Sequence, residues 1–62
     1  MTLEQLFAEV KSLGLYVNNL FQLHDGTWQA NLRNSNNGFE FGHGFTPQIA
    51  MRNCIDKVKN NG

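Results

Sequence analysis

The order of patterns along the chain predicts an α+β domain: a three-stranded antiparallel meander with two helices on one face, in the order α-β-β-β-α. Apolar residues recur at helical spacing near both ends, whereas they alternate with polar residues through the middle. Two turn-forming stretches, Asp25-Gly26 and residues 34–38, divide the middle into three strands. We therefore expect the 62 residues (1–62) to form a single small domain, a two-layer sandwich with one uncovered sheet face.

The first helix begins at a capping box, Thr2-Leu3-Glu4-Gln5, in which the Thr2 and Gln5 side chains satisfy free backbone donors. Gly14 is the expected C-terminal stop. The apolar stripe of this helix consists of Leu3, Leu6, Phe7, Val10 and Leu13.

Asp25-Gly26 is the strongest hairpin signal in the chain. A two-residue turn there pairs Leu23 with Trp28 and Phe21 with Ala30, so apolar residues of both strands share the covered face. In the third strand we expect Phe39 and Phe41 on that same face and Glu40 on the other. The uncovered face should then carry polar residues, namely Gln22, His24, Thr27, Gln29, Asn31, Arg33 and Glu40.

The second helix has Thr46 as its N-cap and Pro47 at its first position, and Phe45 is placed to pack onto Ala50. Gly42 and Gly44 are expected to turn the chain into this helix. Residues favourable for a helix C-terminus end it, namely Lys57, Lys59 and Asn60-Asn61-Gly62. Its buried stripe consists of Ala50, Met51, Cys54, Ile55 and Val58.

Composition disfavours several classes of function. Five Lys and Arg balance five Asp and Glu, so the whole domain has no general attraction to phosphate backbones or anionic membranes. No apolar run is long enough to span a membrane, and no secretory signal pattern begins the chain, so a cytoplasmic location is the default expectation. The single Cys54 excludes an internal disulfide.

The chain resembles a double-stranded-RNA-binding domain in element order, in length and at the junction Gly42-His43-Gly44-Phe45-Thr46. The resemblance implies the dsRBD-like fold and, through it, duplex RNA as a ligand. It does not extend to the lysines of that family's phosphate-contact motif, because Pro47, Gln48 and Met51 occupy their positions. The likeness therefore covers the scaffold without the phosphate-gripping residues.

A weaker resemblance is to short αβ proteins encoded by phages and mobile elements. Trp28-Gln29-Ala30 and residues 42–50 carry it, and HicB-type antitoxins share a related strand, corner and helix. Such proteins act by binding another macromolecule, so this resemblance implies a small regulator or inhibitor.

The sequence carries only weak signals for a metal site, an anion site or a catalytic residue. His24 and His43 have no Cys or carboxylate at ligand spacing, which favours surface histidines over a metal site. Gly42-x-Gly44 before a helix resembles an anion cradle, but a tight corner is the simpler interpretation. Cys54 lies on a buried stripe without an activating neighbour. We expect no catalytic residues, no metal and no cofactor.

The leading hypothesis is therefore a non-enzymatic protein-binding module, and a base-stacking role for the aromatic residues is disfavoured because they are expected in the core. A homodimer is a further possibility, since small domains gain stability that way. The alternative is a weak duplex nucleic-acid binder that uses Arg33, Arg52, Lys57 and Lys59. The candidate protein-binding residues are Leu20, Gln22, Gln29, Asn31, Arg33, Phe45 and Ile49.

Overall fold

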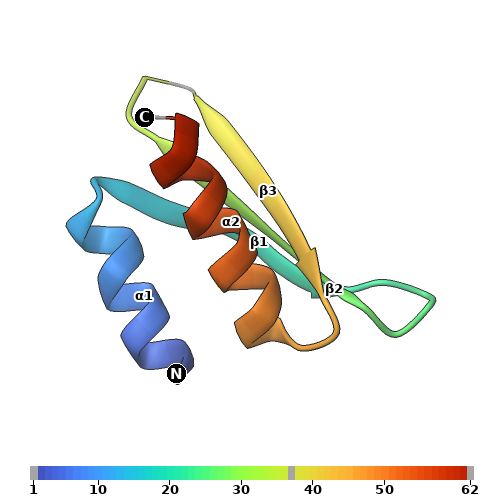
Figure 1. Ribbon diagram of the computed structural model, residues 1–62. Coiled ribbons are helices and arrows are strands. Elements are labelled where there is room, and N and C mark those ends of the chain that lie inside the picture. Colours follow the sequence, from blue (N-terminus) through green and yellow to red (C-terminus); the bar gives the residue numbers. More distant parts are fainter. Residues whose placement is uncertain (1, 37, 62) are drawn as a thin grey trace.

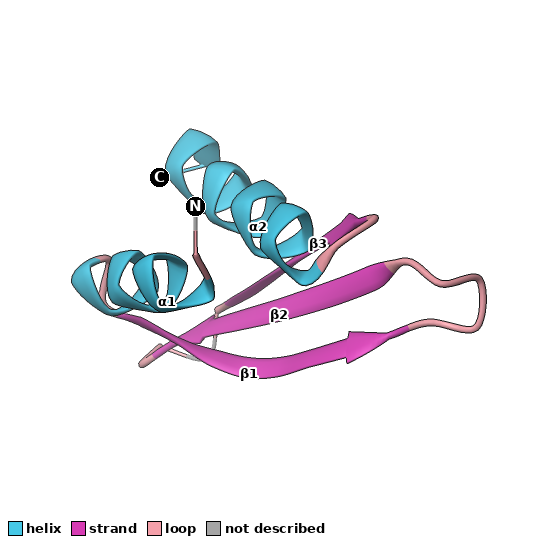
Figure 2. Cartoon of the chain, turned by 90° about the horizontal axis from the view of Figure 1, so that it is seen from below, coloured by secondary structure: helices cyan, strands magenta, loops and turns pink. Residues whose placement is uncertain are grey.

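The predicted element order is confirmed by the computed structural model, which describes residues 2–36 and 38–61. The three strands form one antiparallel sheet in the order β1-β2-β3. Both helices lie on the same face of this sheet, so the molecule has two layers and one uncovered sheet face (Figure 1, Figure 2). The elements are α1 (Leu3–Ser12), β1 (Leu15–Gln22), β2 (Trp28–Asn34), β3 (Phe39–Gly44) and α2 (Pro47–Asn61).

The predicted ends of α1 and the predicted start of α2 are confirmed by their caps. The Gln5 amide donates to Thr2 Oγ1 at 3.1 Å, and the Thr2 amide donates to Gln5 Oε1 at 2.9 Å, which completes the capping box. Gly14 follows α1 with a φ of +75°, a left-handed conformation that glycine adopts without strain. At the start of α2 the Ile49 amide donates to Thr46 Oγ1 at 3.1 Å. Residue 37 of the predicted second turn and residue 62 of the predicted helix end lie outside the described residues.

The core lies between the sheet and the two helices. Trp28, Leu15, Val17 and Leu20 pack against its edge while remaining partly exposed. The predicted stripe of α2 is confirmed except that Val58 is only partly buried. The fully buried residues are Leu6, Val10, Ala30, Leu32, Ala50, Met51, Cys54 and Ile55.

The first hairpin differs from its predicted two-residue turn. The Leu23 amide donates to the Thr27 carbonyl at 2.7 Å, which leaves a three-residue loop, 24–26. Gly26 closes this loop with a φ of +91°, the left-handed third position that such loops require. Gln22 therefore pairs with Trp28, one residue away from the predicted register. A shift of one residue exchanges the two faces of a strand, so the predictions that placed Phe21 on the covered face and Gln22 on the uncovered face are wrong.

A bulge in β1 restores the aliphatic residues to the covered face. The pairing register shifts between Val17 and Asn19, so Asn18 is an extra residue relative to β2. Leu20 pairs with Ala30, and Val17 pairs with Leu32. Both contacts reach the core although three positions separate Val17 from Leu20, a spacing that an unbulged strand would place on opposite faces.

In β3 the predicted faces are reversed. Gly42 pairs with Ala30, and Glu40 pairs with Leu32, so the even-numbered residues face the helices while Phe39 and Phe41 do not. The reason is the close approach of α2: a Cβ atom at Gly42 would lie 2.5 Å from the Cys54 nitrogen, and one at Gly44 would lie 2.7 Å from the Ala50 nitrogen. Only glycine fits at these two positions. Gly42 and Gly44 are thus strand residues beneath α2 instead of the predicted chain-turning pair.

Candidate functional site

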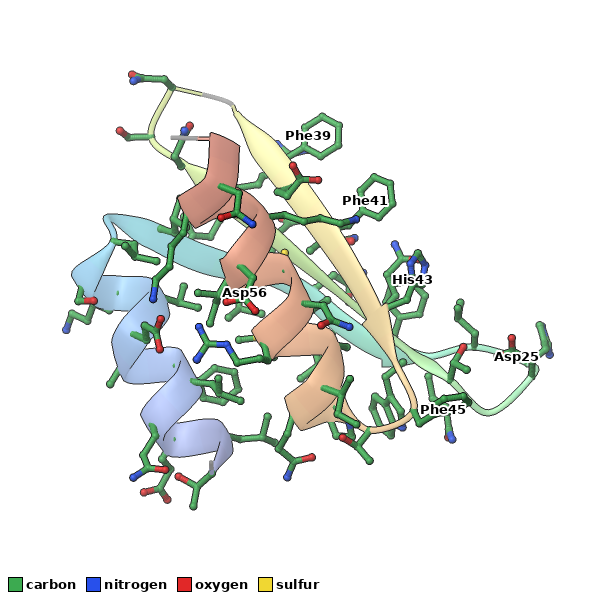
Figure 3. All side chains as sticks on the ribbon, in the orientation of Figure 1. Asp25, Phe39, Phe41, His43, Phe45 and Asp56 are labelled. Atoms are coloured by element: carbon green, nitrogen blue, oxygen red, sulfur yellow. The ribbon has the colours of Figure 1, made fainter. Side chains whose placement is uncertain are left out.

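The uncovered sheet face is lined by aromatic side chains, contrary to the polar surface that the sequence predicted. Phe39 is 66% exposed, Tyr16 52% and Phe41 40%. Figure 3 shows Phe39, Phe41 and His43 following one another along β3 on the side away from α2. Together with their neighbours on β1 and β2 they form what we term the open face, which consists of Tyr16, Phe21, Gln29, Asn31, Arg33, Phe39, Phe41 and His43.

Basic side chains accompany two of the exposed rings. The Arg33 guanidinium carbon lies 5.9 Å from the centroid of the Phe39 ring, and Lys57 Nζ lies 5.2 Å from that of Phe41. The His43 ring meets Phe41 edge to face, with centroids 5.8 Å apart and ring planes at 84°. The β3 side of the open face therefore combines apolar rings with positive charge.

Amide side chains connect the centre of the open face. His43 Nε2 lies 2.8 Å from Gln29 Oε1, and Gln29 Nε2 donates to Asn31 Oδ1 at 3.0 Å. His43, Gln29 and Asn31 therefore form one chain of polar contacts across β3 and β2. A cavity of about 300 Å³ lies beside this chain of amides and is lined by Asn18, Gln29, Asn31, Arg33, Phe39 and Phe41.

The predicted protein-binding residues are not brought to one surface. Leu20 packs against the edge of the core on the covered side. Phe45 is 81% exposed on the loop between β3 and α2 (Figure 3), without the burial expected for packing onto Ala50. Ile49 is 44% exposed on α2. The predicted residues that do lie on the open face are Gln29, Asn31 and Arg33.

The candidate nucleic-acid contacts are also separated. Arg52 and Lys59 of α2 both contact Glu9 of α1, with the Arg52 Nη2 to Glu9 Oε2 distance at 2.9 Å and the Lys59 Nζ to Glu9 Oε2 distance at 2.6 Å. These hydrogen bonds, that of Arg52 first, lower the pKa of Glu9 from 4.5 to about 2. Lys57 instead donates to the Phe41 carbonyl at the β3 edge, and Arg33 lies on the open face. The four cations therefore form no continuous basic surface.

Pro47, Gln48 and Met51, the positions at which the resemblance to double-stranded-RNA-binding domains would imply lysines, have differing environments. Met51 is fully buried in the core. Pro47 and Gln48 lie in the first turn of α2 and are partly exposed. Position 51 thus faces the core, and a side chain there could contact a phosphate group only if α2 were oriented differently.

The Cys54 thiol lies in the core, where its environment is structural. Cys54 is fully buried, its Sγ donates to the Glu40 carbonyl at 3.3 Å, and burial raises the pKa of its thiol to about 11. Within residues 2–36 and 38–61, no group of three or more His, Cys, Asp or Glu side chains could hold a metal ion. Over the same residues no helix has the length and hydrophobicity needed to cross a bilayer.

The residues that sequence reasoning missed are Tyr16, Phe21, Phe39 and Phe41. A signal for β3 was present, because two glycines at positions i and i+2 of a strand are typical of a sheet face that a helix approaches closely. Comparison of the chain with protein-family models, with curated proteins and with solved structures finds no match. Fold and site together define a small α+β domain with an exposed aromatic sheet face.

Proposed function

We propose that this chain is a non-enzymatic protein-binding module whose contact surface is the open face. The observation that carries the proposal is the pair of exposed rings on β3, Phe39 and Phe41, each with a cationic side chain beside it. Aromatic residues and arginine dominate the binding energy of protein interfaces. A partner that presents apolar side chains flanked by carboxylates would complement this surface.

Charge and composition support a protein partner over a phosphate backbone. The open face contributes one permanent cation, Arg33, and Lys57 adds a second from the neighbouring helix. Phosphate-binding surfaces require several such contacts, and the other two candidate cations, Arg52 and Lys59, already contact Glu9. The dsRBD-like element order and the resemblance to short phage-encoded proteins favour a regulator or inhibitor that acts by occupying a partner's surface.

Pull-down from a bacterial lysate tests the proposal when wild type and two variants are compared. The double variant Phe39→Ala with Phe41→Ala removes both rings from the open face. Phe7→Ala is the matched control, because Phe7 is a similarly exposed ring (41%) on the helical layer. We expect the same protein to be retained by wild type and by Phe7→Ala, with nuclease present, and to be lost by the double variant.

Two results would overturn the proposal. Equal retention by all three proteins would mean that the open face is not the contact surface. Retention that disappears after nuclease treatment would replace the protein partner with a nucleic acid. In that case binding of a single-stranded oligonucleotide, followed by fluorescence anisotropy, should weaken in the double variant, because exposed rings stack on bases.

A further inference from the structure

The two edges of the sheet differ in how their backbone is protected. At the β3 edge, side chains of α2 cover the carbonyl groups: Lys57 Nζ donates to the Phe41 oxygen at 2.9 Å, and Asn53 Nδ2 donates to that of His43 at 2.6 Å. Among the described residues, no side chain makes a comparable bond to the outer edge of β1. An edge strand whose backbone groups lack such side-chain bonds is a template for pairing with another strand, although β1 carries a bulge at Asn18, a feature that turns some edges away from partners.

Hydrogen bonds near both ends of β1 indicate which of its backbone amide and carbonyl groups point away from β2. Leu23 bonds to Thr27, so alternation along the strand directs the amides and carbonyls of Leu20 and Gln22 away from β2. At the other end Asn34 bonds to Gly38 on the β3 side, so its β1 partner Leu15 has its backbone groups directed outward. Val17, two residues along, shares that direction.

These outward positions are symmetric about the centre of β1. Antiparallel pairing with a second β1, centred between Asn18 and Asn19, sets Leu15 opposite Gln22 and Val17 opposite Leu20. Each outward backbone group then meets another outward group. The bulge does not disturb this match, because the extra residue of each copy falls at the two-fold axis, where the asparagines of one strand face those of the other.

The side chains are also matched in kind. Val17 and Leu20 both face the helical layer, and Tyr16 and Phe21 both lie on the open face. For these four residues pairing therefore sets aliphatic against aliphatic and aromatic against aromatic, and toward each end Leu15 lies opposite the polar Gln22. A largely apolar groove of about 530 Å³ runs beside this edge, and it is lined by Phe7, Val10, Leu15, Tyr16 and Val17 together with the charged Lys11.

We propose that two copies of this chain form a two-fold symmetric dimer by antiparallel pairing of their β1 strands, centred on Asn18 and Asn19. The six strands then form one continuous sheet, and the two open faces join into a single surface. The proposal shares Tyr16 and Phe21 with the open face but does not involve Phe39 and Phe41, which lie on β3, at the far side of each sheet from the dimer edge.

Sedimentation equilibrium over a concentration series tests the dimer. We expect the mass of the wild type to rise from that of the 7.0 kDa monomer to twice that value. Tyr16→Lys combined with Phe21→Lys sets like charges opposite each other across the axis and should weaken association about tenfold relative to Tyr16→Glu combined with Phe21→Lys. A monomer mass throughout, or equal association of the two double variants, would overturn the proposal.

Disulfide formation tests the register. Tyr16→Cys and Phe21→Cys place thiols directly opposite each other only when the two variants are mixed, because within either homodimer the introduced cysteines are separated by about five residues of strand, or roughly 17 Å. We expect covalent dimers in the mixture and not in either variant alone, with wild type, which contains only the buried Cys54, as the background control. Equal cross-linking in all samples would overturn this register.

Discussion

Gly42 of β3 lies directly beneath the backbone of Cys54 in α2, so closely that a Cβ atom at position 42 would be 2.5 Å from the Cys54 nitrogen. This contact sets the distance between helix and sheet. It also requires the even-numbered residues of β3 to face the helix, which places Phe39 and Phe41 on the open face. The aromatic surface thus follows from a packing constraint in the core.

Replacing Gly42 by alanine should destabilise the fold, because the added methyl group meets backbone atoms that cannot move independently. We expect Gly42→Ala to lower the free energy of unfolding by about 2 kcal/mol or more, measured by urea denaturation. Gly38→Ala is the control. There the three atoms nearest the added carbon all belong to the Asn34 side chain instead of the backbone, so we expect a smaller loss, confined to the two hydrogen bonds that Asn34 Oδ1 accepts from the Asn36 and Gly38 amides. Equal losses would contradict the proposed role of close packing.

The open-face aromatics should contribute little to stability, in contrast to the core position that the sequence predicted for them. We expect Phe39→Ser and Phe41→Ser each to change the free energy of unfolding by less than about 1 kcal/mol, because both rings are substantially exposed. Leu32→Ala, in the fully buried part of β2, should cost about 2–5 kcal/mol. A loss from either serine variant as large as that from Leu32→Ala would place the rings in the core.

The contact of Glu9 with Arg52 and Lys59 should make stability depend on pH in the acid range. Because folding lowers the pKa of Glu9 from 4.5 to about 2, the carboxylate stabilises the fold fully above its ordinary pKa, and this contribution is lost as pH falls toward 2. Glu9→Gln should therefore be less stable than wild type near neutral pH, and the difference should shrink on acidification. Urea denaturation at several pH values measures both quantities.

The control for this measurement is Glu4→Gln, which removes a carboxylate from the same helix without removing a contact with α2. A difference between wild type and Glu9→Gln that stays constant from neutral to acid pH would refute the assignment. High salt should narrow the difference near neutral pH, because both cations are partly exposed to solvent.

Cys54 should react only when the chain unfolds. Its thiol is buried and its pKa is raised to about 11, so almost none of it is the reactive thiolate at neutral pH. With an aromatic disulfide reagent we expect slow labelling of the native protein and complete, rapid labelling in concentrated urea, followed by absorbance. Rapid stoichiometric labelling without denaturant would show that α2 opens readily from the sheet.

The sequence allowed the helices, their caps and the strand order to be predicted, because these depend on residues close together in the chain. Thr2 with Gln5, and Thr46 with Ile49, make their bonds within three positions. The faces of the strands were predicted less well. Asp25-Gly26 is compatible with loops of two or three residues. The longer loop shifts the register by one residue, so Leu20 and not Phe21 pairs with Ala30 on the covered face.

What the sequence determined by itself is the order of elements, the amphipathic helices and the near neutrality of the chain. Only the tertiary structure decided which residues are exposed on the uncovered face of the sheet. The bulge at Asn18 and the approach of α2 to Gly42 both depend on contacts between distant segments, and together they place Tyr16, Phe39 and Phe41 on the open face. Alternation along a strand specifies that two faces exist, whereas the packing partner selects the one that is buried.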